Sequence, residues 1–217
     1  MEKVDFTPQQ KIIVEAFKKE PRLFKRFYLT SGTALSVFYF GHRRSEDLDF
    51  FTEEKFDPPE VIDLVQKWGN TYNFEVAIRQ VERVLIFRIK FKDGGKTKAD
   101  FNCYPYKRLK ESRVIDGMMV DSLFDIAVNK FLLINQRTDI KDFVDLYFIK
   151  DKLGIWGFMD GVKQKFGFEL DPILVAADFM KVEEFDFLPK MISPLTIEEL
   201  QNYFKQKARE VSERFVE

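Results

Sequence analysis

Residues Ser31–Phe51 read SGTALSVFYFGHRRSEDLDFF and hold the signals that decide the fold. The apolar run at 27–30 just before them predicts a short strand, and Ser31 and Gly32 predict a tight turn. The spacing of the apolar residues that follow predicts a helix that stops at Gly41 in a left-handed conformation. A strand, a turn of small residues and a helix, in this order, aim unpaired main-chain amides at a bound phosphate.

Two carboxylates follow this turn. Asp47 and Asp49 are one residue apart at the start of the next apolar run, so on a strand both point to the same face. A later predicted strand, at 98–104, carries Asp100 on its polar face and could lie beside them. Like charges in such a group repel unless a cation lies between them, and Mg²⁺ prefers carboxylate oxygens together with substrate phosphates. Asp47 and Asp49 alone are also typical of an ordinary exposed strand end, but with the preceding Ser31-Gly32 turn the segment predicts a metal ion and a triphosphate at one site.

The composition limits the classes of protein to which this chain can belong. The 217 residues are 45% hydrophobic, which is enough to bury a sizeable core. The single cysteine, Cys103, excludes a disulfide within the chain and is typical of a reducing cytoplasm. The N-terminus has no charged-then-apolar signal pattern, and no apolar run approaches the roughly 20 residues that span a bilayer. We expect a cytoplasmic protein with no membrane segment.

The formal net charge of -1 hides a basic middle segment. Arg79–Arg113 contains eleven Lys or Arg residues and four acidic ones. Such a segment fits a polyanion partner, either a nucleic acid or a triphosphate, and a solvated strand face is the ordinary alternative. The sequence leaves both open.

The pattern of predicted elements changes near residue 118. Before it, short runs rich in β-branched residues alternate with helical stretches, and after it only helical spacing is found. We expect an α+β fold in which a mixed-sheet domain at 1–118 is followed by a helical domain at 119–217. The remaining strands are predicted at 74–78 and 84–89, and the helices at 6–17, 58–70, 122–135, 140–152, 155–166 and 196–215.

Lys130 interrupts an apolar helix face. Its neighbours on that face, at helical spacing, are Leu123, Ala127 and Ile134. Buried lysines are rare without a partner. Lys130 therefore either forms an internal salt bridge, or extends its aliphatic stem so that the ammonium reaches water, or binds triphosphate.

Asp142 and Asp145 lie three residues apart on the next predicted helix, so they can face the same way. They are candidates to anchor Lys130 or Arg137, or to accept a proton from a substrate. A surface pair between Lys141 and Asp145 is the ordinary alternative.

The loop before Asp47 contains His42, the only histidine, followed by Arg43 and Arg44. A lone loop histidine is usually incidental. The two arginines are better phosphate candidates because guanidinium groups bind phosphate in bidentate fashion.

Together these stretches resemble the AbiEii/AbiGii-type nucleotidyltransferase toxins, a branch of the polymerase-beta-like nucleotidyltransferase superfamily. The resemblance covers roughly residues 25–150, and its specificity comes from the joint order of the motifs. The motifs are SGTAL, HRRSEDLDF, KADF, DIAVNKFLLINQR and KDFVDLY. It implies a minimal nucleotidyltransferase core, a mixed sheet flanked by helices, joined to a helical domain. It also implies transfer of a nucleoside monophosphate (NMP) from a nucleoside triphosphate (NTP) to an acceptor.

The resemblance also assigns roles by position. The phosphate-binding turn is Ser31, Gly32 and Thr33, and the metal ligands are Asp47, Asp49 and Asp100. The signature before the carboxylates includes Arg43 and Ser45. Lys130 matches the family's helical lysine, and its final acidic pair is matched by Asp142 and Asp145. The resemblance implies that Asp145 orients the lysine or assists proton transfer. The turn is Ser-Gly here where Gly-Gly or Gly-Ser is usual, and serine tolerates a positive φ less readily than glycine.

From the resemblance we expect an Mg²⁺-dependent nucleotidyltransferase whose acceptor is RNA, such as tRNA, or a protein. Members of the family act as the toxic half of bacterial toxin–antitoxin or phage-exclusion systems, so a cognate antitoxin is an expected partner. Two alternatives remain open: a non-catalytic nucleotide- or protein-binding module on the same fold, and a phosphotransferase that uses the same triphosphate site.

Overall fold

The computed structural model describes residues 4–152 and 154–216 of the chain, with side chains described up to residue 213. The chain forms two compact units. The sheet unit comprises Met1–Tyr39, Ser45–Lys107 and Glu111–Asp121, and the helical unit comprises Phe40–Arg44, Arg108–Lys110 and Ser122–Glu217. The sheet unit therefore continues past residue 118, and two short segments from the first half of the chain belong to the helical unit.

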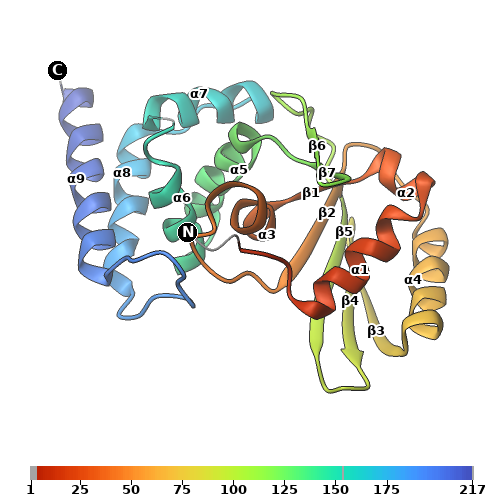
Figure 1. Cartoon of the computed structure of the whole chain (residues 1–217). Helices are drawn as coiled ribbons and strands as arrows, with labels where there is room; N and C mark the ends of the chain where they lie inside the picture. Colours follow the sequence, from red (N-terminus) through yellow and green to blue (C-terminus); the bar gives the residue numbers. More distant parts are fainter. Residues whose placement is uncertain (1–3, 153, 217) are drawn as a thin grey trace. The chain divides into compact units, whose positions relative to one another are not determined.

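A seven-stranded mixed sheet with the strand order β3-β4-β5-β2-β1-β7-β6 forms the centre of the sheet unit (Figure 1). Its two parallel pairs are β2 with β5 and β1 with β7. The strands are β1 (Tyr28–Thr30), β2 (Asp47–Thr52), β3 (Phe74–Val81), β4 (Val84–Phe91), β5 (Lys96–Cys103), β6 (Arg113–Ile115) and β7 (Met118–Val120). Burial alternates along β2 and β5, so one face of these strands forms the core. The predicted α+β fold with a mixed sheet is confirmed.

Helices α1 (Pro8–Lys18) and α4 (Pro58–Tyr72) pack against the buried face of the sheet (Figure 1). Thr7 and Gln10 form a capping box that starts α1. The ring of Phe17 on α1 stacks on Phe50 of β2, with the ring centroids 4.4 Å apart. These aromatic contacts fix the strand that carries Asp47 and Asp49 against the core.

The predicted strand–turn–helix is present, with one difference in the helix. Strand β1 leads into α3 (Ser31–Ala34), which continues as a π-helical segment, Leu35–Phe40. Gly41 has φ 61, so the predicted left-handed stop is confirmed. Ser31 has φ 63, a conformation that costs little for glycine and more for serine.

Five elements were not predicted. Pro21 begins a short helix, α2 (Pro21–Arg26), because its missing amide is no loss at a first helical position. Strands β6 and β7 form a hairpin whose two turn residues, Asp116 and Gly117, both have positive φ. Helix α8 (Pro172–Met180) and a 3-10 turn at Lys181–Glu184 lie in the C-terminal half.

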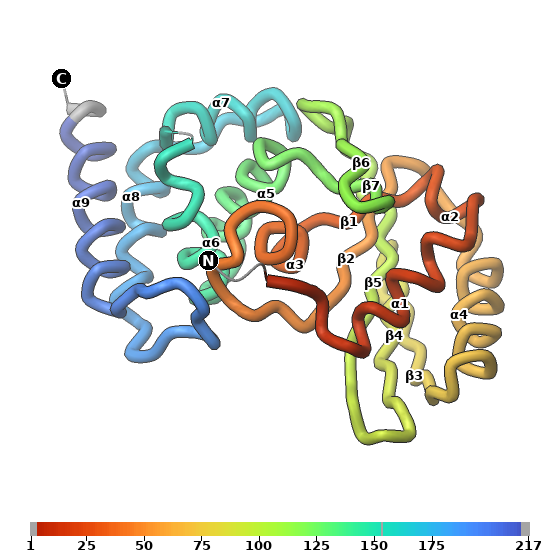
Figure 2. The backbone as a smooth tube through the Cα atoms, viewed as in Figure 1, coloured from red at the N-terminus to blue at the C-terminus, as the bar shows by residue number. Residues whose placement is uncertain are grey.

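The helical unit consists of α5 (Leu123–Gln136), α6 (Ile140–Ile149), α7 (Ile155–Phe166), α8 and α9 (Ile197–Val216). Helices α8 and α9 run side by side (Figure 2). A cluster of aromatic rings forms the core of this unit: Phe131, Phe143, Phe158, Phe179 and Phe204. Within residues 4–152 and 154–216, no helix has the length and apolar character needed to cross a membrane.

Candidate active site

The three carboxylates predicted as metal ligands lie on two neighbouring strands. Strand β2 pairs in parallel with β5, and Asp49 is the register partner of Asp100. Asp47 lies two residues before Asp49 on the same half-exposed face of β2. The prediction that the Asp100 strand lies beside the Asp47–Asp49 strand is confirmed.

A lysine ammonium bridges two of these carboxylates. Lys98 Nζ lies 3.0 Å from Asp100 Oδ2 and 3.3 Å from Asp47 Oδ2. Burial by itself lowers the pKa of Lys98, but its hydrogen bond to Asp100 and the charges of Asp100, Asp47 and Asp49 together raise it. Burial raises the pKa of Asp100, and Lys98 opposes this effect only in part. The three carboxylates therefore already have one positive charge among them, the Lys98 ammonium between an oxygen of Asp47 and an oxygen of Asp100.

Three side chains fix the main chain where β2 begins. Gln10 Nε2 donates to the carbonyl of Ser45 over 3.0 Å, and Thr97 Oγ1 donates to the carbonyl of Glu46 over 3.0 Å. The Thr33 hydroxyl donates to the carbonyl of Asp47. The turn after β1 and the first carboxylate are thus joined directly, although thirteen residues of helix and loop lie between them.

The turn itself lies next to Asp49. Thr30, the last residue of β1, is the register partner of Asp49, and Ser31 follows it. Gly32 and Thr33 are buried and Ser31 is half-buried. The first helical amides after the turn therefore begin beside the second carboxylate, as a phosphate site next to a metal site requires.

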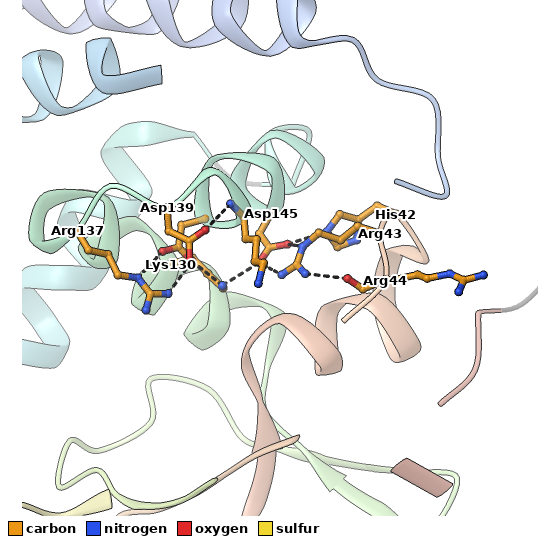
Figure 3. A network of polar contacts seen from close by, with 9 residues as sticks. His42, Arg43, Arg44, Lys130, Arg137, Asp139 and Asp145 are labelled. Atoms are coloured by element: carbon orange, nitrogen blue, oxygen red, sulfur yellow. Dashed lines mark hydrogen bonds and ion pairs between the residues drawn. The ribbon is translucent and has the colours of Figure 1, made fainter. Parts of the chain in front are cut away.

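A second polar network lies inside the helical unit, centred on Asp145 (Figure 3). The Arg43 guanidinium binds both oxygens of Asp145, with Nε–Oδ1 2.7 Å and Nη2–Oδ2 2.8 Å. Lys130 Nζ lies 2.8 Å from Asp145 Oδ2, and His42 Nε2 lies 2.8 Å from Asp145 Oδ1. All four side chains are buried.

Asp142 extends this network. Lys130 Nζ lies 2.7 Å from Asp142 Oδ1, and the Arg137 guanidinium donates to both oxygens of Asp142. Lys130 therefore lies between two carboxylates, and Arg137 is a second partner of Asp142. Of the alternatives that the sequence left open, the internal salt bridge of Lys130 is present in the structure.

Opposite charges dominate the electrostatics of this network. Burial alone raises the pKa of Asp145, but Lys130, Arg43 and the hydrogen bonds from His42 and Arg43 hold it well below its usual value. Burial lowers the pKa of Lys130, and the charges of Asp145 and Asp142 more than reverse this, so the pKa is raised. Asp145 and Lys130 are therefore both ionised at neutral pH. The other ring nitrogen of His42, Nδ1, is buried and has no hydrogen-bond partner among the described residues.

The predicted site residues thus form two groups. The sheet unit brings together the turn, the loop before β2 and the three carboxylates: Ser31, Gly32, Thr33, Ser45, Asp47, Asp49 and Asp100. The helical unit brings together Arg43, Lys130, Asp142 and Asp145.

Sequence reasoning did not single out Lys98, Gln10 or Thr97. Lys98 had a usable signal, because it lies two residues before Asp100 and therefore on the same strand face. Gln10 had none, since its contact with Ser45 spans 35 residues.

The donor set suits a divalent cation. Carboxylate oxygens are the ligands that Mg²⁺ prefers, and the Lys98 ammonium shows that Asp47 and Asp100 accept a cation between them. Asp100 Oδ1 is buried without a hydrogen-bond partner among the described residues. In the described part of the chain, no three His, Cys, Asp or Glu side chains are gathered around one cation position, and the Lys98 ammonium lies between Asp47 and Asp100.

A mixed sheet with carboxylates on adjacent strands beside a strand–turn–helix is the arrangement that the resemblance to nucleotidyltransferases implied. The fold is similar to that of JHP933 from Helicobacter pylori, with a TM-score of 0.58 and 19% identity over 97% of this chain and 94% of that one. It is also similar to MenT4, the nucleotidyltransferase toxin Rv2826c of Mycobacterium tuberculosis H37Rv, with a TM-score of 0.54 and 14% identity over 93% and 82%.

The chain belongs to the AbiEii nucleotidyl transferase toxin family of type IV toxin–antitoxin systems, whose model matches residues 14–213. It is therefore a nucleotidyltransferase of the toxin type. A curated relative, "Uncharacterized protein aq_aa25" of Aquifex aeolicus (strain VF5), is 32% identical over 193 residues, which is 86% of this chain and 88% of the relative. The resemblance drawn from the motifs is confirmed.

Proposed function

We propose that this protein transfers an NMP group from an NTP to a hydroxyl or phosphate of an RNA acceptor, and that it depends on Mg²⁺. The observation that carries the proposal is the pairing of Asp49 with Asp100 across β2 and β5, with Asp47 on the same face. Three carboxylates next to a phosphate-binding turn supply ligands for metal ions and for a triphosphate at one place.

In this proposal Asp47, Asp49 and Asp100 hold the metal. When bound, Mg²⁺ would neutralise the triphosphate and the charge that develops on the leaving pyrophosphate. Ser31, Gly32 and Thr33 bind phosphate oxygens through the turn, and Thr33 also fixes the start of β2 through the Asp47 carbonyl.

The reaction is a displacement at the α-phosphorus of the NTP. The acceptor oxygen forms a bond to this phosphorus as the bond to the bridging oxygen of the β-phosphate breaks, and pyrophosphate leaves. Lys130 and Arg43 are assigned to charge neutralisation on the resemblance, with Asp142 and Asp145 as the groups that hold their orientation. Ser45 contributes its main chain through Gln10.

As a toxin of a type IV system, the protein would act in the cytoplasm and would have a cognate antitoxin. RNA is the acceptor we propose, because the basic segment Arg79–Arg113 fits a polyanion.

The test is an incubation of the protein with Mg²⁺, each of the four labelled NTPs in turn, and total cellular RNA. We expect label to enter RNA with one or more NTPs, and Asp49→Ala to abolish the transfer. Asp63→Ala, which removes an exposed carboxylate on α4, is the matched control and should transfer at the wild-type rate. Label on protein but not on RNA would identify a protein acceptor, and equal transfer by Asp49→Ala would refute the proposed site.

A further inference from the structure

The open face of β3, β4 and β5 carries a row of cations that leads directly to the three carboxylates. Register partners on paired strands point to the same face, so the pairings place Arg88 opposite Lys98, and Lys90 opposite Lys96. Lys98 in turn is the register partner of Asp47. Arg88, Lys90 and Lys96 are exposed. Four of the eleven cations of the basic segment, Arg88, Lys90, Lys96 and Lys98, therefore lie together next to the candidate active site.

Two features argue against an ordinary solvated strand face. Like charges directly opposite each other destabilise a sheet, and β4 and β5 contain two such pairs in succession. Asp47 and Asp100 offset the charge of Lys98, and Glu75 of β3 is the register partner of Lys90 on its other side. Lys90 and Lys96 form no ion pair with any described residue. The exposed cations Arg88, Lys90 and Lys96 outnumber the exposed carboxylate of Glu75 beside them, so a polyanion along this face would supply the remaining counter-charge.

The surface is also hollowed. A cavity of about 520 Å³ lies over these strands, and its charged lining consists of four cations, Arg88, Lys90, Lys96 and Lys98, and three carboxylates, Glu46, Asp47 and Glu75. Its volume suits one nucleotide unit of a chain. The lining contains no aromatic ring on which a base would stack, so the contacts offered are charges for phosphates rather than a reading of the base.

The strand order gives the surface a direction. In the order β4-β5-β2-β1, the turn at Ser31 lies on the β1 side of the carboxylates, and the cations lie on the β5 side. In an in-line displacement the attacking and leaving oxygens lie on opposite sides of the phosphorus. If the triphosphate is held at the turn as in the proposed function, pyrophosphate leaves towards β1 and the acceptor oxygen approaches from the β5 side.

We propose that this face, through Arg88, Lys90 and Lys96, binds the phosphodiester backbone of a single-stranded RNA acceptor and delivers its end to the carboxylates. This proposal rests on the proposed function for its direction, but binding to the surface is a separate property. Because the contacts are made with phosphates, binding is salt-dependent and nearly independent of base sequence.

The experiment measures the affinity of the full-length protein for a labelled twelve-nucleotide single-stranded RNA of mixed sequence, by fluorescence anisotropy, without NTP or metal. The variant is Lys90→Gln/Lys96→Gln. The matched control is Lys25→Gln/Lys67→Gln, which removes two exposed lysines from α2 and α4 and changes the net charge equally. Thermal melting of both variants checks that they are folded.

We expect the Lys90/Lys96 variant to bind at least about tenfold more weakly, and the control to stay within about twofold of wild type. The slope of log affinity against log salt should become shallower by about 1.4, at roughly 0.7 for each single-strand phosphate that the variant no longer neutralises. Equal weakening in both variants, no RNA binding by the wild type, or equally tight binding of polyglutamate of the same length would overturn the proposal.

The two experiments distinguish failure of the proposed RNA-binding face from failure of the proposed NMP transfer. RNA binding that depends on Lys90 and Lys96, without NMP transfer to any acceptor, would support the proposed RNA-binding face and refute the proposed activity. NMP transfer to RNA by a protein whose RNA binding does not depend on Lys90 and Lys96 would support the proposed activity and refute the proposed surface.

Discussion

Asp49 on β2 and Asp100 on β5 are direct register partners across a parallel strand pair. Two carboxylates on adjacent strands repel each other, and burial already raises the pKa of Asp100. A sheet gains nothing from such a pair. In the proposed function, a metal ion bound by both residues would offset this repulsion.

Replacing either partner should abolish catalysis without unfolding the protein. We expect Asp49→Asn and Asp100→Asn to lower NMP transfer by about 10²–10³-fold or more, because each removes charge stabilisation at the reacting phosphate. A carboxyl whose pKa is raised by folding is less stable when ionised in the folded state, so Asp100→Asn should melt no lower than wild type at pH 7. Transfer assays and thermal melting, with Asp63→Asn as control, check this. A large drop in the melting temperature would instead indicate a structural role.

Lys98 should compete with a divalent cation for Asp47 and Asp100. We expect Lys98→Met to bind Mn²⁺ about tenfold more tightly, since one nearby positive charge in a partly exposed site is worth roughly 1–2 kcal/mol. Isothermal titration calorimetry measures the affinity without substrate. Lys96→Met removes the same charge two residues away on the same strand face and should tighten binding less. Equal effects of the two variants would refute a specific role for Lys98.

The Asp145 network should contribute stability that depends on pH. Asp145→Asn leaves Lys130 and Arg43 with one counter-charge fewer in a buried place, so we expect it to lower the free energy of unfolding at pH 7 by about 3–5 kcal/mol. The pKa of Asp145 is lowered by folding, so its contribution is present above the unfolded value near 4 and is lost as the pH falls below it. Urea unfolding at pH 7 and at pH 3 should therefore show a smaller difference between wild type and variant at pH 3.

Asp139→Asn is the matched control for this measurement. Asp139 caps the same helix, α6, and asparagine caps a helix as well as aspartate does, so the change should be nearly neutral. A difference between wild type and Asp145→Asn that does not shrink at low pH would show that poorer packing, and not charge, causes the effect.

The Ser31 turn should tolerate glycine better than serine. Ser31 has φ 63, and relief of this strain should raise the free energy of unfolding of Ser31→Gly by up to about 1 kcal/mol. Ser212→Gly makes the same change at an exposed position inside α9, where glycine costs about 0.5–1 kcal/mol. Opposite signs for the two variants in urea unfolding are the expected result. A loss of stability at both positions would mean that the Ser31 hydroxyl stabilises the turn.

The local alternation of apolar and polar residues predicted much of the sheet unit. The alternation along 47–52 and 96–103 is visible in the sequence, because one face of each strand is buried. The same reasoning found Asp100, since its neighbours Ala99 and Phe101 are buried. It could not find Gln10, whose partner lies far along the chain.

Two helices show where pattern fails. In α8 nearly every residue is apolar, so no helical period separates one face from the other. Pro21 at the start of α2 is compatible both with the end of one helix and with the first position of another, so the sequence pattern does not separate the two. The Asp145 network was predicted only as a set of alternatives, since spacing gives helix faces but not which charged residues meet.

The membership of Phe40–Arg44 in the helical unit has a consequence for how the protein folds on the ribosome. His42 and Arg43 form ion pairs or hydrogen bonds with Asp145, and the sequence separation of His42 and Asp145 is 103 residues. A nascent chain has made the turn and all three carboxylates well before Asp145 emerges. Until then Arg43, which lies between the turn and β2, lacks the Asp145 carboxylate as its counter-ion. The protein therefore completes its fold only late in synthesis.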